Sequence, residues 1–241
     1  GSESDTADYS YITDTKAINA DLSRTNNQEV FEIVTPANYD HLIGIENVVG
    51  TKNNDIMKGS DDFALTNTLF GYKGDDSFIS SKGSDYIDGG SEIDTLDYSN
   101  VDLGNGGNRV IIDLSTNRAL DDGYQTAGSA VVDYIYNIER IIGTSGDDKV
   151  YGDSANNTLE GGAGKDTLEG NNGDDSLVGG TGDDIIDGGA GEDKIYGGDD
   201  NDTIYGGAGV DSLLGEAGND TFYAGSGNDI ITGGDGIDLL S

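Results

Sequence analysis

The 241-residue chain has no cysteine or tryptophan, one proline, one histidine, and 12 lysines and arginines against 47 aspartates and glutamates. Because cysteine is absent, no disulfide can stabilise the fold, and bound metal is the remaining means of cross-linking. Because basic residues are scarce, the chain is not expected to bind nucleic acid or anionic lipid. No apolar run is long enough to span a membrane, so membrane insertion is not expected, and no signal peptide is recognisable.

The acidic excess and the abundance of glycine both oppose a compact fold. The formal net charge is −35, and 40 residues are glycine. Folding must therefore overcome carboxylate repulsion and a large loss of backbone entropy. Bound divalent cations would oppose the repulsion directly. The same composition also fits a disordered tract, and that alternative stays open for the chain without cations.

Motifs for catalysis are missing from the sequence. The single histidine, His41, is followed by Leu42, so no H-E-x-x-H zinc motif exists, and a catalytic triad would have to use His41. The glycine-containing run at 164–166 lacks the spacing of a phosphate-binding loop. Paired carboxylates are common, but they recur once per repeat, which indicates binding rather than acid–base chemistry. We therefore predict that the chain is not an enzyme and has no catalytic residue.

Residues 143–241 consist of eleven consecutive nine-residue units without an insertion or a deletion. The clearest unit, residues 188–196, reads G-G-A-G-E-D-K-I-Y. Positions one, two and four are mostly Gly, position six is Asp in ten of the eleven units, and position eight is always apolar. A fixed period this short predicts stacked coils that each bury one residue against their neighbours. A disordered tail would not be expected to keep an apolar residue at every ninth position.

The positions of the repeat have different physical roles. The segment G-G-x-G-x-D predicts a turn, because Gly adopts positive φ and leaves backbone carbonyls unshielded. The segment x-U-x, where U is apolar, predicts a short strand whose middle side chain points inward. Two units complete one coil, so each unit stacks on the second unit after it. Carboxylates and carbonyl oxygens then face each other between turns, and these hard oxygen ligands suit Ca²⁺. The period of nine excludes an EF-hand, whose loop sequence is also absent.

The nonapeptide closely resembles the repeats-in-toxin (RTX) family, whose repeat is G-G-x-G-x-D-x-U-x. The resemblance covers all of 143–241 and part of 50–97. It implies an all-β fold, a right-handed parallel β-roll (a β-solenoid) with Ca²⁺ between successive turns, bound by the position-six aspartate and loop carbonyls. The aspartates that match this position are Asp55, Asp76, Asp85, Asp94, Asp148, Asp166, Asp175, Asp184, Asp193, Asp202, Asp211, Asp220, Asp229 and Asp238.

The stacking of turns predicts the number of ions. Eleven loops, divided between two edges, give roughly nine stacked neighbours in 143–241, and the shorter run at 50–97 adds about three. About twelve Ca²⁺ would bring the net charge near −11. Some sites are expected to be weak, because Asn157 replaces an Asp, and Ala155 and Asp200 stand where Gly is usual.

The two halves of the chain resemble each other, since the run at 45–51 recurs at 138–144. We predict two head-plus-roll copies in tandem and no amphipathic helix. The expected parts are a tail with a cloning remnant at 1–8, a first β head at 9–49, a first short roll at 50–97, a second β head at 98–142, and the second roll at 143–241. Within the heads we expect strands at 30–34, 41–49, 109–115 and 131–142. Each head would supply longer coils that start a stack, or else a compact antiparallel cap.

Positions seven and nine flank the inward residue and should point outward. Position nine then places Tyr205 beside Tyr223 on one sheet, and Val178, Tyr196 and Leu214 in a row on the other. These rows can be ordinary cross-strand packing or a docking patch for a neighbouring domain or a sugar ring. Position seven is too mixed to form the flat threonine rank of an ice-binding surface.

Two functions fit the sequence. The first is a Ca²⁺-dependent, non-enzymatic module of a secreted or surface-attached bacterial protein, with calcium ions and neighbouring domains as partners. The resemblance implies export by type I secretion from a Gram-negative bacterium, and the tandem layout is most similar to a large adhesin. The second is a carbohydrate-binding module of a secreted enzyme such as an alginate epimerase, or the repeat domain of a protease or lipase. The scarcity of basic residues argues against an acidic glycan but not against a neutral one.

Overall fold

The computed structural model describes residues 5–12, 17–22, 29–33, 39–42, 45–60, 65–81, 83–100, 109–120 and 132–241, with only the backbone course for 29–33 and 39–42. The chain divides into two compact units. The first comprises Gly1–Tyr98 and Asn117–Ile138, and the second comprises Ser99–Thr116 and Glu139–Ser241. Both are all-β: the one helical element of the described residues is a single 3₁₀ turn, η1 (Leu114–Thr116). A search of the same residues finds no helix that is long and apolar enough to cross a membrane.

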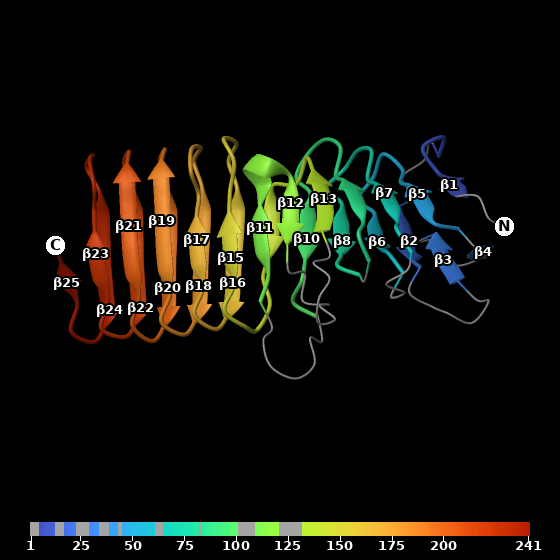
Figure 1. Cartoon of the computed structure of the whole chain (residues 1–241). Helices are drawn as coiled ribbons and strands as arrows, with labels where there is room; N and C mark the ends of the chain where they lie inside the picture. Colours follow the sequence, from blue (N-terminus) through green and yellow to red (C-terminus); the bar gives the residue numbers. More distant parts are fainter. Residues whose placement is uncertain are drawn as a thin grey trace. The chain divides into compact units, whose positions relative to one another are not determined.

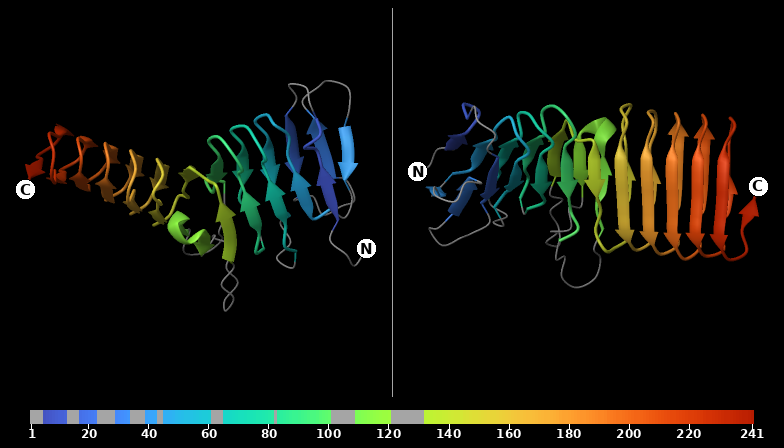
Figure 2. Two further views of the ribbon diagram at one scale, coloured as in Figure 1. Left: turned by 90° about the horizontal axis from the view of Figure 1, so that it is seen from above. Right: turned by 180° about the vertical axis from the view of Figure 1, so that it is seen from behind.

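The x-U-x triplets of the second unit form strands that alternate between two parallel sheets (Figure 1). One sheet contains β11 (Ile111–Asp113), β15 (Lys149–Tyr151), β17 (Thr167–Glu169), β19 (Ile185–Ala190), β21 (Thr203–Ala208), β23 (Thr221–Tyr223) and β25 (Leu239–Leu240). The other contains β14 (Arg140–Ile142), β16 (Thr158–Ala163), β18 (Ser176–Thr181), β20 (Lys194–Asp199), β22 (Ser212–Ala217) and β24 (Ile230–Asp235). Val150 pairs with Leu168, and Leu168 pairs with Ile186. Two nonapeptides therefore make one coil, as predicted, and the turned views show the same succession of coils (Figure 2).

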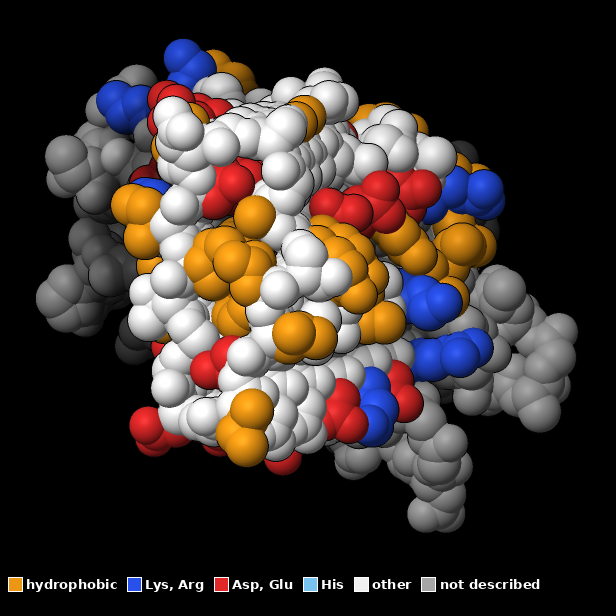
Figure 3. All heavy atoms as spheres, turned by 90° about the vertical axis from the view of Figure 1, so that its left-hand side faces the viewer, with side chains coloured by type: hydrophobic (Ala, Val, Ile, Leu, Met, Phe, Trp, Pro, Cys, Tyr) orange, Lys and Arg blue, Asp and Glu red, His pale blue; other side chains and the backbone are white. Residues whose placement is uncertain are grey.

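Position eight of the repeat forms the core of the second unit. All nine residues at this position from Val150 to Phe222 are at most 1% exposed. The prediction of an inward position eight is confirmed for these coils. In the last coil Ile231 is half-buried and Leu240 is 61% exposed, since no further coil covers them. Figure 3 views this end of the unit and shows hydrophobic side chains gathered in the middle of the face.

Seven strands of the second unit are longer than the predicted triplet, with six residues each. They continue through the first three residues of the next repeat, so that Gly162 pairs with Gly180 and Ala163 with Thr181. The added pairing is possible because stacked turns repeat the same backbone course and Gly allows close approach of two backbones.

The first unit uses the same parallel arrangement with less regular spacing. One sheet contains β1 (Thr6–Asp8), β5 (Asn47–Val49), β7 (Thr68–Phe70), β9 (Tyr86–Asp88) and β13 (Val132–Tyr136), and the other contains β2 (Ile18–Asp21), β6 (Ile56–Lys58), β8 (Ser77–Ile79) and β10 (Thr95–Asp97). Met57 pairs with Phe78, 21 positions further on, whereas Phe78 pairs with Leu96, 18 positions further on. The unit at 59–70 has twelve residues instead of nine. Its three extra residues lengthen one coil without moving Met57 or Leu69 out of the core.

The segments outside the repeat add antiparallel strands. β3 (Glu29–Ile33) pairs antiparallel with β2 and with β4 (Tyr39–Leu42), and β12 (Arg118–Leu120) pairs antiparallel with β13. The predicted strand at 30–34 agrees with β3. The predicted strand at 41–49 is wrong as one element, because β4 ends at Leu42 and β5 begins at Asn47. Likewise, 131–142 contains both β13 and β14, and the strand expected at 109–115 ends at Asp113 and gives way to η1.

Equivalent contacts in the two units agree with an internal duplication. The N–H of Ile18 donates to Asp55 Oδ1 at 2.7 Å, and the N–H of Val110 donates to Asp148 Oδ1 at the same distance. Tyr9 and Tyr98, in the matching runs D-Y-S at 8–10 and 97–99, are both buried, although both belong to the first unit. The segments before each run of repeats thus contribute strands to the stack, while the predicted boundaries of heads and rolls stay a prediction.

The residues at position nine form the two predicted rows, one on each sheet. The rings of Tyr205 and Tyr223 are stacked, with centroids 4.6 Å apart and planes inclined by 8°. On the other sheet the register pairs Val178 with Tyr196 and Tyr196 with Leu214. Both rows follow from the parallel register, which places equivalent residues of successive coils side by side.

Candidate metal centre

The position-six aspartates lie in the turns, immediately before the strands. Twelve of the fourteen predicted ligands are buried, while Asp229 is half-buried and Asp238 is exposed in the last coil. Burial of one carboxylate per turn is expensive unless each is hydrogen-bonded or neutralised. Within each unit the structure therefore brings the predicted residues into rows along the edges of the coils rather than into a single cluster.

The first carboxylate oxygen, Oδ1, connects neighbouring coils. The backbone N–H of Asp148 donates to Asp166 Oδ1 at 2.7 Å, and that of Asp166 donates to Asp184 Oδ1 at 2.8 Å. On the other edge the N–H of Asp175 donates to Asp193 Oδ1 at 2.9 Å. Each side chain thus holds the turn of the preceding coil in register.

The second oxygen, Oδ2, has a different environment in most turns. It is fully buried and accepts no hydrogen bond from any described residue in Asp76, Asp166, Asp175, Asp184, Asp193, Asp202, Asp211 and Asp220. An unsatisfied buried oxygen of an ionised group is strongly destabilising. A cation at this oxygen would remove that penalty.

Burial changes the protonation of these groups. Loss of hydration raises the pKa of Asp76 and Asp166 to about 8, and that of Asp175 and Asp202 to about 7. Neighbouring carboxylates raise the pKa further, because each charge opposes the next along the row. The protein atoms alone therefore favour a protonated carboxyl, and a bound cation would reverse this preference.

The glycine at position one brings a second oxygen to the same place. A Cβ on Gly161 would lie 2.3 Å from Asp166 Oδ2 and 2.8 Å from the carbonyl oxygen of Gly179 in the next coil. A Cβ on Gly170 would likewise lie 2.3 Å from Asp175 Oδ2 and 2.5 Å from the carbonyl oxygen of Gly188. A side chain is therefore excluded, and a carboxylate oxygen and a carbonyl oxygen of successive coils converge at each turn.

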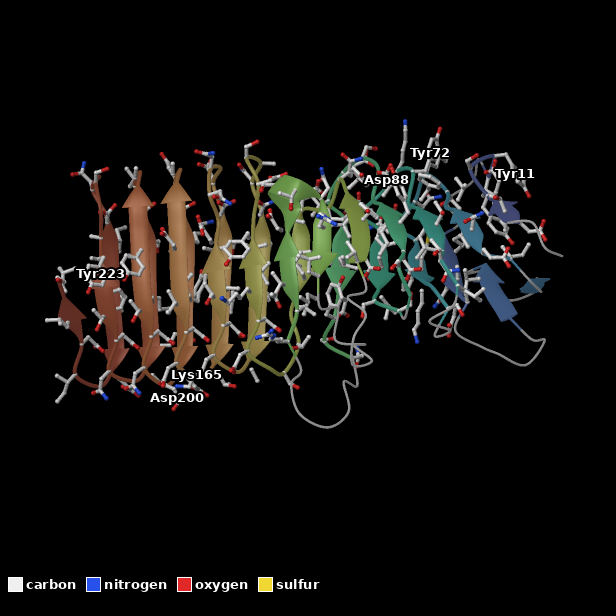
Figure 4. The ribbon with its side chains drawn as sticks, in the orientation of Figure 1. Tyr11, Tyr72, Asp88, Lys165, Asp200 and Tyr223 are labelled. Atoms are coloured by element: carbon white, nitrogen blue, oxygen red, sulfur yellow. The ribbon has the colours of Figure 1, made fainter. Side chains whose placement is uncertain are left out.

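Positions two and four of the turn require unusual backbone angles. Gly180 and Gly182 have φ of 117° and 116°, in the left-handed region. A Cβ on Gly182 would lie 1.8 Å from the carbonyl oxygen of Gly164 below it. Asp200, at position four of its unit, adopts a φ of 79° without being glycine, which supports the expectation of a weaker turn there. Figure 4 shows Asp200 and Lys165 along the same edge of the ribbon.

The donor set fits a hard cation. Carboxylate and carbonyl oxygens are the ligands that Ca²⁺ prefers, and sulfur or imidazole ligands of the softer metals do not accompany them here. Among the described residues no group of three or more His, Cys, Asp or Glu side chains could hold a metal. Each turn offers one carboxylate and backbone carbonyls instead, so the site would depend on the stacking of two turns.

Asp133, which the sequence pattern did not predict, occupies the place of a position-six residue. It is buried, and its Oδ1 accepts the N–H of Asp85 at 2.7 Å, as the repeat aspartates do for their neighbours. The signal was the run at 133–136, D-Y-I-Y, which matches D-Y-I-D at 85–88. Without the glycines of a preceding turn, this similarity was not recognised.

A second row of side chains, at position five, was also missed. Asn201 Oδ1 accepts the N–H of Asn219 at 2.9 Å, and Asn219 Oδ1 accepts the N–H of Ile237 at 3.0 Å. Lys165 forms an ion pair with Asp183, and this bond lowers the pKa of Asp183 to about 2. These exposed residues bridge coils outside the candidate sites.

Comparison with known proteins identifies the repeat. The model of the RTX calcium-binding nonapeptide repeat matches four stretches, residues 63–96, 137–168, 169–204 and 205–240. Together they cover more than half of the chain. No curated protein matches the sequence.

Proposed function

The chain belongs to the RTX calcium-binding nonapeptide repeat family, and we propose that it is a Ca²⁺-dependent structural module of a secreted or surface-exposed bacterial protein. In this proposal the chain folds when it meets Ca²⁺ outside the cell, after type I secretion, and then extends or presents neighbouring domains. The β-roll of this family is a structural module that binds Ca²⁺, and it is typical of secreted proteins.

The row of buried carboxylates is the observation that carries the proposal. In the second unit seven aspartates have an Oδ2 that accepts no hydrogen bond from the described residues and that lies near a carbonyl oxygen of the following coil. These residues would hold the ions, and Ca²⁺ would supply the positive charge that opposes their mutual repulsion. In the first unit Asp76 would bind an ion in the same way. The aspartates that would bind ions in the second unit are Asp166, Asp175, Asp184, Asp193, Asp202, Asp211 and Asp220.

Ca²⁺-dependent folding follows from the free-energy cost of burying these carboxylates. Without a cation, a chain with a formal charge of −35 must bury a row of unpartnered carboxylates, and glycine-rich turns add their own entropy cost. The free energy of Ca²⁺ binding would therefore be part of the free energy of folding. Cytosolic Ca²⁺ is far below the millimolar extracellular range, so the chain could remain unfolded until it is exported.

Circular dichroism and small-angle scattering of the full chain test this proposal. In chelator the chain should be expanded, without the signal of β-strands, and millimolar Ca²⁺ should make it compact and β-rich. Mg²⁺ at the same concentration is the matched control. It should not restore the fold, because it demands shorter bonds and near-ideal octahedral geometry. An unchanged spectrum in chelator would contradict the proposal.

A glycan is the second candidate ligand, and the tyrosine stack is the observation that favours it. The parallel rings of Tyr205 and Tyr223 lie on an outer face, and Tyr223 is 38% exposed. Aromatic faces of this kind stack against sugar rings. A glycan array, probed with the Ca²⁺-loaded chain and with Tyr223→Ser, tests it. Binding that depends on Tyr223 supports a lectin-like module, and absence of binding leaves only the packing role.

A further inference from the structure

The turns of both units fall into two classes that the nonapeptide pattern does not separate. In the first class, here called open turns, the residue at position two has a positive φ, as in Gly162, Asn171 (73°) and Glu216 (76°). In the second class, here called closed turns, the residue at position two does not have a positive φ and is never glycine. The closed turns have Thr51, Ser60, Ser81, Thr144 and Asp153 at this position.

The two classes treat the position-six side chain differently. In the closed turn at 143–151 the N–H of Thr144 donates to Asp148 Oδ2 at 2.6 Å, and its hydroxyl lies 3.0 Å from both carboxylate oxygens. The closed turn at 50–58 repeats this, with the N–H of Thr51 at 2.5 Å from Asp55 Oδ2. In the open turns of the second unit, by contrast, Oδ2 accepts no hydrogen bond from the described residues in any buried position-six aspartate.

In the other closed turns the residue at position two also donates to the side chain at position six, but the donor group differs. The Ser81 hydroxyl donates to Asp85 Oδ2 at 2.7 Å. In two turns position six is the uncharged Asn67 or Asn157, whose Oδ1 accepts the N–H of Ser60 at 2.6 Å or of Asp153 at 2.9 Å. Every closed turn therefore either satisfies its carboxylate with protein donors or has no carboxylate.

Four of the five closed turns have a consistent place along the chain, and the fifth, with Ser81, belongs to the fourth unit of the first run. The units at 143–151 and 152–160 are the first two of the eleven, one on each edge, and the units at 50–58 and 59–70 are the first two of the other run. Asp148 and Asp55 receive the N–H of Val110 and Ile18, which belong to the segments before the repeats. The first turns are thus the ones on which those segments stack.

We propose that the closed turns bind no Ca²⁺. In these turns Thr144 and Thr51 donate hydrogen bonds to the carboxylate oxygen that, in an open turn, would bind the ion. This inference rests on the proposed function and refines it. Each stack would begin on a coil whose carboxylates are satisfied without metal, and Ca²⁺ would be required only from the first open turn onward.

The proposal changes the expected number of ions in the second unit. The repeat predicts nine stacked pairs of turns in this unit. Two of them, 143–151 with 161–169 and 152–160 with 170–178, have a closed turn as the first member. Removing these two leaves about seven ions, one for each open-turn aspartate whose buried Oδ2 lacks a partner.

The number of Ca²⁺ ions bound by the full chain, measured by equilibrium dialysis, tests the proposal with matched variants. Asp166→Asn, in the first open turn of its edge, should lose one ion. Asp148→Asn, in the closed turn directly below it, should lose none. Thr144→Gly gives that turn the G-G-x-G-x-D sequence of its neighbours, allows a positive φ at position two, and should gain one ion.

Two controls separate the role of Thr144 from general destabilisation. Thr144→Ser keeps both donors and should bind as many ions as the wild type. Thr181→Gly makes the same change at position three of an open turn, where the side chain is exposed, and should also leave the number unchanged. Loss of an ion in Asp148→Asn, or an unchanged number in a folded Thr144→Gly, would overturn the proposal. If Thr144→Gly does not fold, the numbers of ions bound by Asp148→Asn and Asp166→Asn still show whether the closed turn binds Ca²⁺. If Asp166→Asn loses no ion, the proposed function itself fails.

Discussion

The two units are built from the same nonapeptide, and they differ in how strictly they repeat it. In the second unit every strand from β15 to β23 pairs with the strand 18 positions along, and seven strands extend into the turns. In the first unit one coil is three residues longer, Ser80 and Ser81 replace two glycines, and Asp133 completes a turn from outside the repeat. The core position tolerates these changes, since Met57, Phe78 and Leu96 are all fully buried. The apolar residue thus sets the stack, whereas the residues of the turns vary between the two units.

Removal of Ca²⁺ should produce the largest effect, and it should separate the two units. Without Ca²⁺, seven aspartates of the second unit have a buried Oδ2 that no described residue satisfies. In the first unit Asp76 has such an oxygen as well, but Asp55 and Asp85 keep protein donors. Hydrogen exchange of the full chain during a Ca²⁺ titration should show the amides of 161–241 losing protection at a higher Ca²⁺ concentration, and over a narrower range, than those of 45–100. Equal protection of both units in chelator would show that the unpartnered carboxylates do not decide stability.

Acid should partly replace Ca²⁺ in the chelated chain. Burial raises the pKa of Asp76 and Asp166 to about 8, from an ordinary value of 3.8, so the folded state binds protons that the unfolded chain has released. The stability from these groups is fully present below about pH 4 and is lost as the pH rises to about 8. In chelator, circular dichroism should therefore show more β-structure near pH 5 than near pH 9.

The opposite dependence is expected when Ca²⁺ is present, because a carboxylate must lose its proton before it binds the ion. More Ca²⁺ should be needed to fold the chain near pH 5 than near pH 8. A chelated chain whose β-structure increases with pH would contradict the assignment of raised pKa values to the folded state.

The sequence predicts the regular part of this architecture because the repeat is local. Period, register, burial of position eight and the row of aspartates all follow from nine residues and the rule that each unit stacks on the second one after it. Two features needed the structure. The antiparallel strands β3, β4 and β12 pair outside the repeat, where no period fixes a partner. The protein donors to Asp148 and Asp55 depend on the φ of Thr144 and Thr51, and the turn pattern alone does not reveal that angle.

A cavity in the core should cost a similar amount in either unit if position eight alone sets the stack. Leu177 and Leu96 are both fully buried, in the second and first units respectively. Leu177→Ala and Leu96→Ala should each destabilise the Ca²⁺-loaded chain by about 2–5 kcal/mol. Thermal unfolding in saturating Ca²⁺ measures this. A much smaller loss for Leu96→Ala would mean that the first unit is packed loosely despite its buried core.

The smallest effect should come from the outer tyrosines. Tyr205 and Tyr223 stack on the second unit, while Tyr86 and Tyr136 stack on the first, with centroids 5.0 Å apart. Tyr223→Ser and Tyr136→Ser should each reduce stability by about 0.5–1.5 kcal/mol beyond the loss of buried area. Chemical denaturation in Ca²⁺ compares them. If Tyr223→Ser leaves stability unchanged but abolishes association with a sugar or a second chain, the stack is a docking surface.

The positions of the bound ions test the account most directly. Anomalous diffraction from crystals of the full chain grown in Ca²⁺ should place about seven ions in the second unit, each beside the Oδ2 of an open-turn aspartate from Asp166 to Asp220. No ion should lie beside Asp148, whose Oδ2 accepts the N–H and hydroxyl of Thr144. Ions bound elsewhere, with these buried oxygens still unpartnered, would contradict the claim that the carboxylate rows are what Ca²⁺ stabilises.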